Sequence, residues 1–422
     1  MARWILPLIY TLTAVIAGIV LPRIEAAFLP HLGLGVSAGA ALAVLSAIAS
    51  GMMALTAIVF SIAFVMVQFS AVTYSPRIAL RFANDPLLFH AMGMFAATFT
   101  YAIAAMAWID REGSAAVPAL SSLSSVGLLL ASLVMFTRLV QRLSDLQITS
   151  TLRQIGDSGR RAIEDVFAKR SLPGEARPAA ADTPLPSTST RIQVLRYEGP
   201  PVTVQRFDIA ALVGLAGKAG GSIVMACSVG DTLSEGEPIL YLHGTASPLA
   251  EAELLRAVAL GHDRTVEQDP KYPIRLLVDI AIKALSPAIN DPTTAVQAID
   301  QIEDLLRRLA RHELDAGRFA DAEGTARLFV PMPTWNDYLS LALDEIRMFG
   351  VGSVQVMRRL RHTLKGLTEL LGDDPRAASV ALYLRHLDAF IEQSPLDAMD
   401  KRTARQEDSQ GLGLTREPGG PD

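Results

Sequence analysis

The chain has 422 residues, of which half are hydrophobic and 19% are charged, and its formal net charge is −5. This length allows two or three domains, and the composition is too apolar for a typical soluble protein and too polar for one that lies wholly in a bilayer. The negative charge argues against nucleic-acid binding, because phosphate backbones require a basic surface. The single cysteine, Cys227, excludes an internal disulfide and a zinc site built from several cysteines. It lies in the apolar run 223–229, which predicts a small buried hydrophobic side chain.

Four apolar stretches in the first 145 residues predict a transmembrane domain. They cover residues 5–21, 38–67, 90–109 and 120–139, and crossing a hydrocarbon core takes about 20 apolar residues. The first stretch could instead be a secretory signal, with Glu25 and two alanines as a weak cleavage site. Its length favours a retained span.

Basic residues predict the orientation of these spans. Arg77 and Arg81 lie in the second connection and several arginines follow the fourth stretch, whereas Arg23 and Arg111 each stand beside an acid. Cytoplasmic loops carry an excess of Lys and Arg, so we expect both termini to face the cytoplasm of a bacterial inner membrane. Apolar residues four apart beside Arg77 and Arg81 predict an amphipathic segment on anionic lipid.

Small and hydroxyl-bearing residues recur at helical spacing within the spans. The second span carries Ser46, Ser50, Ala54, Ala57, Ser61 and Gln68, and the fourth carries Ser121, Ser125 and Ser132. Such rows let helices approach closely, and they could alternatively line a water-filled path in an oligomer. Ser46, Ser50, Ser61 and Gln68 are therefore candidate pore or helix-packing residues. No charged residue lies in the middle of a span, which argues against a pump more than against a channel or an anchor.

A connector and a small β module are predicted after the membrane domain. Residues 146–190 read as a helix followed by a linker rich in Pro, Ser and Thr. Residues 191–245 contain short alternating runs separated by turn residues, with one short helix after Asp208. The stretch VGDTLSEGEPILYL resembles the turn and last strands of a lipoyl- or biotinyl-like barrel-sandwich module. The hairpin has no lysine, so we expect an adapter module without a covalently attached group.

Residues 246–393 predict an all-α domain, with helices over 248–260, 273–285 and 292–309, and residues 394–422 predict a disordered tail. A proline-framed corner, SPAINDP, joins the second and third of these helices. Asp291 before Pro292 is a typical N-cap signature. The helix N-terminus could also bind an ion, so structural corner and ligand site both remain open for Ser286, Asn290, Asp291, Thr293 and Thr294. Arg358, Arg359, Arg361 and Lys365 form a basic run, which predicts a solvated face or a contact with anionic lipid.

Three motifs carry a resemblance to a known family. ALSPAINDPTTA, HDRTVEQDP and SAVTYSPRIALRFANDP together resemble a bacterial family of predicted integral membrane proteins of unknown function, the DUF2254 type. The resemblance spans nearly the whole chain. It implies four membrane helices and a cytosolic domain, and it supplies no activity, cofactor or catalytic residue.

The expected fold is an α-helical membrane protein with four transmembrane helices, followed by a small β-barrel or sandwich module and an all-α domain. No HExxH motif is present, so we predict no catalytic residue, metal ligand or cofactor. The expected function is an oligomeric channel or transport-related protein with a regulatory cytosolic domain. A membrane-anchored ligand sensor or scaffold is the alternative, and a membrane-bound hydrolase is the third reading. Expected partners are membrane lipids, further copies of the chain and an unidentified small ion or ligand.

Overall fold

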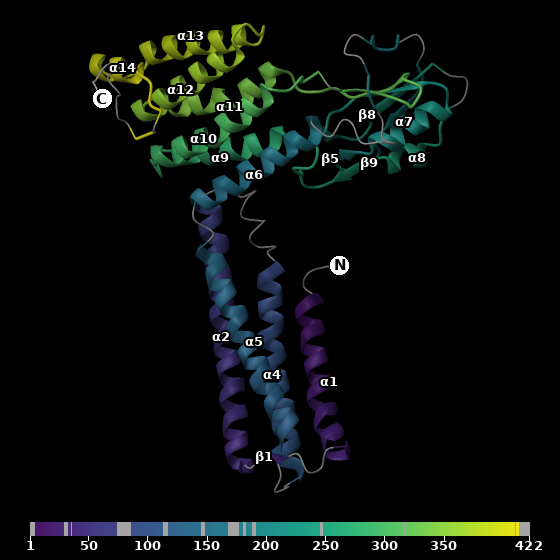
Figure 1. Ribbon diagram of the computed structural model, residues 1–422, viewed down its shortest axis with the longest axis vertical. Coiled ribbons are helices and arrows are strands. Elements are labelled where there is room, and N and C mark those ends of the chain that lie inside the picture. Colours follow the sequence, from purple (N-terminus) through teal and green to yellow (C-terminus); the bar gives the residue numbers. More distant parts are fainter. Residues whose placement is uncertain are drawn as a thin grey trace. The chain divides into compact units, whose positions relative to one another are not determined.

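The computed structural model describes residues 5–28, 33–34, 36–73, 86–112, 117–144, 148–167, 177–179, 183–187, 191–244, 248–315, 317–409 and 411–412 (Figure 1). The chain divides into two compact units, Met1–Gln147 and Ile148–Asp422. The predicted amphipathic connection with Arg77 and Arg81, and most of the predicted linker, lie outside the described residues.

The first unit consists of four long apolar helices. They are α1 (Ile5–Phe28), α2 (Ala38–Thr73), α4 (Pro86–Glu112) and α5 (Ala119–Ser144). All four are long and apolar enough to cross a membrane, as the sequence predicts. The short strand β1 (Gly33–Leu34) lies between α1 and α2, and β2 (Val117–Pro118) lies between α4 and α5. The two strands pair antiparallel. Each helix extends beyond its predicted span at one end or at both ends.

Helix α4 is the centre of the first unit, because it packs against α1, α2 and α5 (Figure 1). Phe95 and Ala102 on α4 are fully buried. Two glycines let α1 and α4 approach closely: a Cβ atom on Gly18 would lie 2.6 Å from the Cβ of Ala104, and one on Gly93 would lie 2.8 Å from Cδ2 of Tyr10. Small residues at the contact are the usual basis of helix packing in membranes.

The second unit contains a group of packed helices. They are α6 (Ile148–Phe167), α9 (Lys271–Ala284), α10 (Pro292–Leu309), α11 (Trp335–Phe349), α12 (Val354–Leu371), α13 (Ala377–Gln393) and α14 (Ala398–Ala404). Helix α10 lies against α6, α9 and α12, and it buries Ile299, Ile302, Leu305, Leu306 and Leu309 completely. Spacings of three and four positions, as in 299–302, 302–306 and 305–309, place these residues on one helical face.

The same unit contains two open sheets. The six-stranded sheet has the order β3 (Arg177–Pro178), β10 (Arg318–Ala320), β11 (Ala326–Phe329), β6 (Ser222–Met225), β8 (Pro238–His243), β4 (Arg191–Arg196). The three-stranded sheet has the order β7 (Thr232–Leu233), β5 (Val202–Phe207), β9 (Val258–Gly261). Together with α7 (Ile209–Lys218) and α8 (Glu251–Arg256), they enclose an apolar core that includes Phe207, Leu212, Ile223, Ile239 and Leu254.

Three predictions about this unit are wrong: the barrel alternative for the β module, the confinement of its strands to residues 191–245, and the helix over 248–260. No closed barrel is formed by the described strands, and the sheets are not confined to residues 191–245: β9 pairs with β5, and β11 pairs in parallel with β6. Residues 246–393 are therefore not all-α. The predicted helix over 248–260 is only α8 followed by β9. A short apolar run such as 257–260 fits a strand or a buried helix equally well, and the long-range pairing decides between them.

The predicted disordered tail is also wrong in its first part. Helix α14 lies within it and packs against α12 and α13. Asp397 caps this helix, with its side chain accepting hydrogen bonds from the amides of Met399 and Asp400 at 2.8 Å each. Residues 413–422 lie outside the described part of the chain.

Candidate functional site

The serine row of α5 is buried inside the first unit. Ser121, Ser125 and Ser132 are at most 2% exposed. The hydroxyl oxygens of Ser132 and Thr98 on α4 lie 2.8 Å apart, so that one hydroxyl donates to the other, and the accepting hydroxyl can donate to a carbonyl of its own helix. The row therefore serves close packing between α4 and α5, with one hydrogen bond across the interface.

Glu25 is a buried acidic residue whose role the sequence did not reveal. It lies near the end of α1 and is 3% exposed. Its carboxylate accepts hydrogen bonds from the amides of Leu120 and Ser121, at 2.9 and 3.1 Å, in the first turn of α5. The first amides of a helix have no partner within it, and a negative charge at this end is stabilised by the helix dipole. The sequence does contain an indication of this role, because an acidic residue at the end of an apolar membrane segment usually has a specific partner.

The small-residue row of α2 has the opposite environment. Ser46, Ser50, Ser61 and Gln68 are all exposed, whereas the buried face of the helix carries Leu45, Ile48, Met52 and Val59. At 100° per residue, the row lies opposite the buried face. The Ser50 hydroxyl donates to the carbonyl of Ser46 at 2.8 Å. The four side chains are thus not used for packing against the other described helices of the chain.

The predicted corner between α9 and α10 forms a compact turn whose side chains hydrogen-bond to nearby residues. Asp291 is the N-cap of α10, and its two carboxylate oxygens accept from the Thr294 amide (3.1 Å) and the Thr294 hydroxyl (2.6 Å). The Ser286 hydroxyl donates to the Lys283 carbonyl at 2.6 Å. Asn290 has φ of 50°, a left-handed conformation that asparagine tolerates better than most residues.

The structure thus brings all five predicted corner residues into one turn. Asn290 and Thr293 are exposed, and Thr294 is buried. The hydrogen bonds of Asp291 and Ser286 stay within the corner, so its geometry is explained by capping.

The HDRTVEQDP loop joins the sheets to the helices, a role that its sequence did not reveal. The Gln268 side chain accepts from the amide of Phe207 at 3.0 Å and donates to the carbonyl of the same residue at 3.1 Å. Asp269, 1% exposed, is paired with Arg264 at 2.6 Å. Burial raises the pKa of Asp269, and the neighbouring Arg264 opposes that shift. Gly230 must be glycine here, because its φ is 91° and a Cβ would lie 2.2 Å from Arg264.

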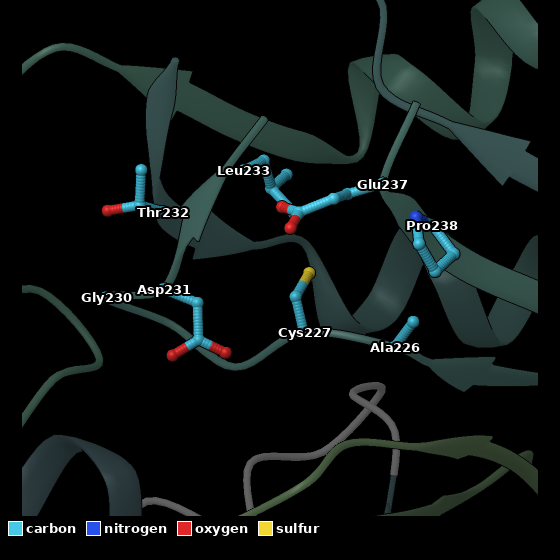
Figure 2. Close-up of a pocket in the computed structure, with 8 residues that line it drawn as sticks. All are labelled: Ala226, Cys227, Gly230, Asp231, Thr232, Leu233, Glu237 and Pro238. Atoms are coloured by element: carbon cyan, nitrogen blue, oxygen red, sulfur yellow. The ribbon is translucent and has the colours of Figure 1, made fainter. Parts of the chain in front are cut away.

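A hollow of about 540 Å³ is lined by residues on both sides of the short strand β7 (Figure 2). Cys227 stands between Asp231 and Glu237 in its lining (Figure 2). Burial, with a smaller contribution from these two carboxylates, raises the pKa of the thiol to about 12. Each carboxylate accepts a hydrogen bond from a turn amide, Ser228 at 2.7 Å and Ser234 at 2.8 Å. The thiol is therefore protonated at neutral pH, and the hollow offers no activated nucleophile.

Three of the four residues in the basic run of α12 are buried, contrary to the predicted solvated face, and Lys365 is half-buried. Arg358, Arg359 and Arg361 are 1%, 7% and 7% exposed. Arg359 forms ion pairs with Asp300 (2.7 Å) and Glu303 (2.8 Å) of α10. Glu303 also accepts from Arg307 at 2.7 Å and from Thr363 at 3.1 Å. Buried charges require such partners, and the acids that provide them lie some 60 residues away in the sequence.

Metal ligation has no support in the described part of the chain, where no group of three or more His, Cys, Asp and Glu side chains could hold an ion.

Comparison with known proteins identifies relatives along most of the chain. It is 26% identical over 417 residues to uncharacterized proteins of Mycobacterium bovis (Mb1321c) and Mycobacterium tuberculosis (Rv1290c), covering 95% of this chain and 78% of each relative. No solved structure matches. The family model described as "Predicted membrane protein (DUF2254)" matches residues 2–366. The chain therefore belongs to this family of predicted membrane proteins.

Proposed function

We propose that the protein self-associates in the membrane through α2, and that the assembled α2 helices line a path for small solutes. The observation that carries the proposal is the exposed row Ser46, Ser50, Ser61 and Gln68, opposite the buried face of the same helix. Large apolar side chains are the usual contacts with lipid, whereas small and hydroxyl-bearing residues favour helix–helix contact or a wet lumen. The comparable row on α5 packs inside the unit. The α2 row is exposed, so a second copy of the chain can pack against it.

The chemistry of the row limits what such a path would pass. Helix α2 contains no charged residue, so the proposed lumen presents hydroxyl and amide groups without fixed charge. Rings of charged side chains are one means by which channels discriminate between cations and anions. The proposal therefore predicts weak discrimination between small cations and anions. The second unit then acts as a regulatory domain, covalently connected to the fourth span.

The proposal includes an orientation. The arginine distribution that places the second unit in the cytoplasm of a bacterial inner membrane also places the N-terminus there. A green fluorescent protein fused to the C-terminus should fluoresce, because that protein matures in the cytoplasm and not after export. An alkaline phosphatase fusion at the same point should be inactive, and the reverse pattern would contradict the orientation.

The test measures particle mass and solute flux on one preparation. Wild-type protein in nanodiscs should give the mass of a closed oligomer, and the same protein in liposomes should release entrapped salt. Ser61→Leu and Ser50→Leu should abolish release with the mass retained, because leucine adds bulk on the lumen side. Val44→Phe is the control: Val44 is exposed on α2 but lies about a third of a turn from the centre of the row, so it should retain both.

Two outcomes would contradict the proposal in different ways. Loss of the oligomer in Ser61→Leu would show that the row packs copies together and lines no path. A monomer without flux would overturn self-association as well, and it would favour a membrane-anchored scaffold or sensor.

A further inference from the structure

We propose that the basic face of α12 is a binding site for acidic peptide segments, which residues 405–409 of the same chain occupy in this structure. The basic face consists of Arg358, Arg359, His362 and Lys365, and residues 405–409 are called the C-terminal strap. This inference does not depend on the proposed membrane path.

The strap contacts the basic face through charges and carbonyl oxygens. Arg358 donates to the carbonyl of Glu407 at 3.1 Å, and Arg359 donates to the carbonyl of Asp408 at 3.5 Å. The Lys365 ammonium hydrogen-bonds the Glu407 carboxylate, and Nδ1 of His362 lies 3.6 Å from that carboxylate. The Lys365 contact holds the pKa of Glu407 below its usual range. These four contacts recognise an acidic side chain together with consecutive main-chain carbonyls.

A second set of contacts fixes the far end of the strap. Asp408 is 1% exposed, and its carboxylate accepts from the amide of Gly411 at 2.8 Å. Gly411 has φ of 69°, and a Cβ there would lie 2.6 Å from Val296 of α10. Gln355 of α12 donates to the Gly411 carbonyl. The segment therefore lies over both α10 and α12.

One residue of the basic face, Arg359, is positioned without the strap. Arg359 is fixed from below by Asp300 and Glu303, and Glu303 is in turn fixed by Arg307 and Thr363. This network positions the guanidinium group before any peptide is bound. Preorganised donors lower the entropic cost of binding.

The strap, by contrast, has the chemistry of a bound ligand. Its sequence, Arg-Gln-Glu-Asp-Ser, contains no apolar side chain. The side chains of Glu407 and Lys365 are each 42% exposed, so salt screens their attraction. A segment held in this way can detach while the apolar helix packing beneath it stays intact. Acceptors on successive residues of a backbone fit a peptide better than a lipid headgroup.

Hydrogen exchange of the full chain in nanodiscs tests the release of the strap. Amides of the strap should exchange in wild type at least about a hundredfold faster than those of α10, because local opening costs less than global unfolding. Glu407→Lys and Lys365→Glu should each accelerate strap exchange about tenfold, and the double variant should restore it, since it re-forms one charge-assisted contact. Glu323→Lys, an exposed change of the same charge in the turn between β10 and β11, should have no effect.

Peptide binding tests the site itself. A fluorescent peptide with the sequence of residues 403–412 should bind saturably to the full-length Glu407→Lys variant, whose own strap is displaced. Wild type should bind it at least about tenfold more weakly, because its strap competes. Adding Lys365→Glu to Glu407→Lys restores the intramolecular contact and should remove peptide binding.

Three results would overturn the proposal. Strap exchange at the rate of α10 would make the segment an integral part of the fold. Equal peptide binding by Glu407→Lys and by the double variant would place the peptide elsewhere. Faster strap exchange in anionic than in neutral nanodiscs would show that lipid headgroups are the preferred ligand of the basic face.

Discussion

The serine rows of α5 and α2 are alike in sequence and opposite in environment. Ser132 of α5 is fully buried and bonded to Thr98 across the helix interface, whereas Ser50 of α2 is exposed and bonded to its own helix. Small residues permit a close approach without specifying which helix approaches. The described neighbouring helices pack against the α5 row and not against the α2 row, so the same sequence pattern has two different environments in one molecule.

The glycines offer the strongest test of this difference. At Gly18 a Cβ would lie 2.6 Å from Ala104, whereas at Gly51 of α2 no heavy atom lies within 4 Å of that position. Gly18→Leu should lower the free energy of unfolding of the first unit by about 3 kcal/mol, because the side chain overpacks a closed contact. Gly51→Leu should be neutral or slightly stabilising, because leucine has the higher helix propensity. Denaturation of the purified protein in mixed micelles measures both, and equal losses would contradict the described helix contacts.

A smaller effect is expected from the carboxylate that links α1 to the buried end of α5. Glu25→Gln keeps the size of the side chain and removes the charge that two helix amides share. The expected loss is about 2 kcal/mol, the difference between a charge-assisted and a neutral hydrogen-bond pair at a buried site. Unfolding in the same micelles measures it. Gln68→Glu, a charge change on the exposed row of α2, is the comparison, and it should leave the stability of the monomer unchanged.

The sequence predicted features whose cause is local. The four spans follow from apolar length, and Asp291-Pro292 placed the start of α10 at the residue where the structure has it. The small β module was predicted only in part, because strands β9, β10 and β11 come from beyond its predicted end.

Partners distant in sequence explain what was missed. From the sequence alone Arg359 is predicted to be a surface charge, whereas the fold pairs it with Glu303. Glu25 resembles part of a cleavage site in the sequence, whereas in the structure it accepts a hydrogen bond from the first turn of α5. The predicted corner residues assemble as expected, yet their hydrogen bonds account for capping and leave the ligand hypothesis to experiment. The role of each of these residues depends on the partners that the fold brings to it, and its residue type alone does not reveal that role.

The smallest expected effect compares the two hydroxyls directly. Ser132→Ala removes a contact between α4 and α5 and should cost about 0.6 kcal/mol, the typical value for a hydroxyl bonded across membrane helices. Ser50→Ala should cost nothing measurable in a monomer, because its hydroxyl bonds only a carbonyl of its own helix. Both values come from micelle denaturation repeated at several protein-to-detergent ratios. A Ser50→Ala cost that grows with protein concentration would show that the α2 row becomes an interface when copies meet, and a cost that stays at zero would leave this row facing lipid.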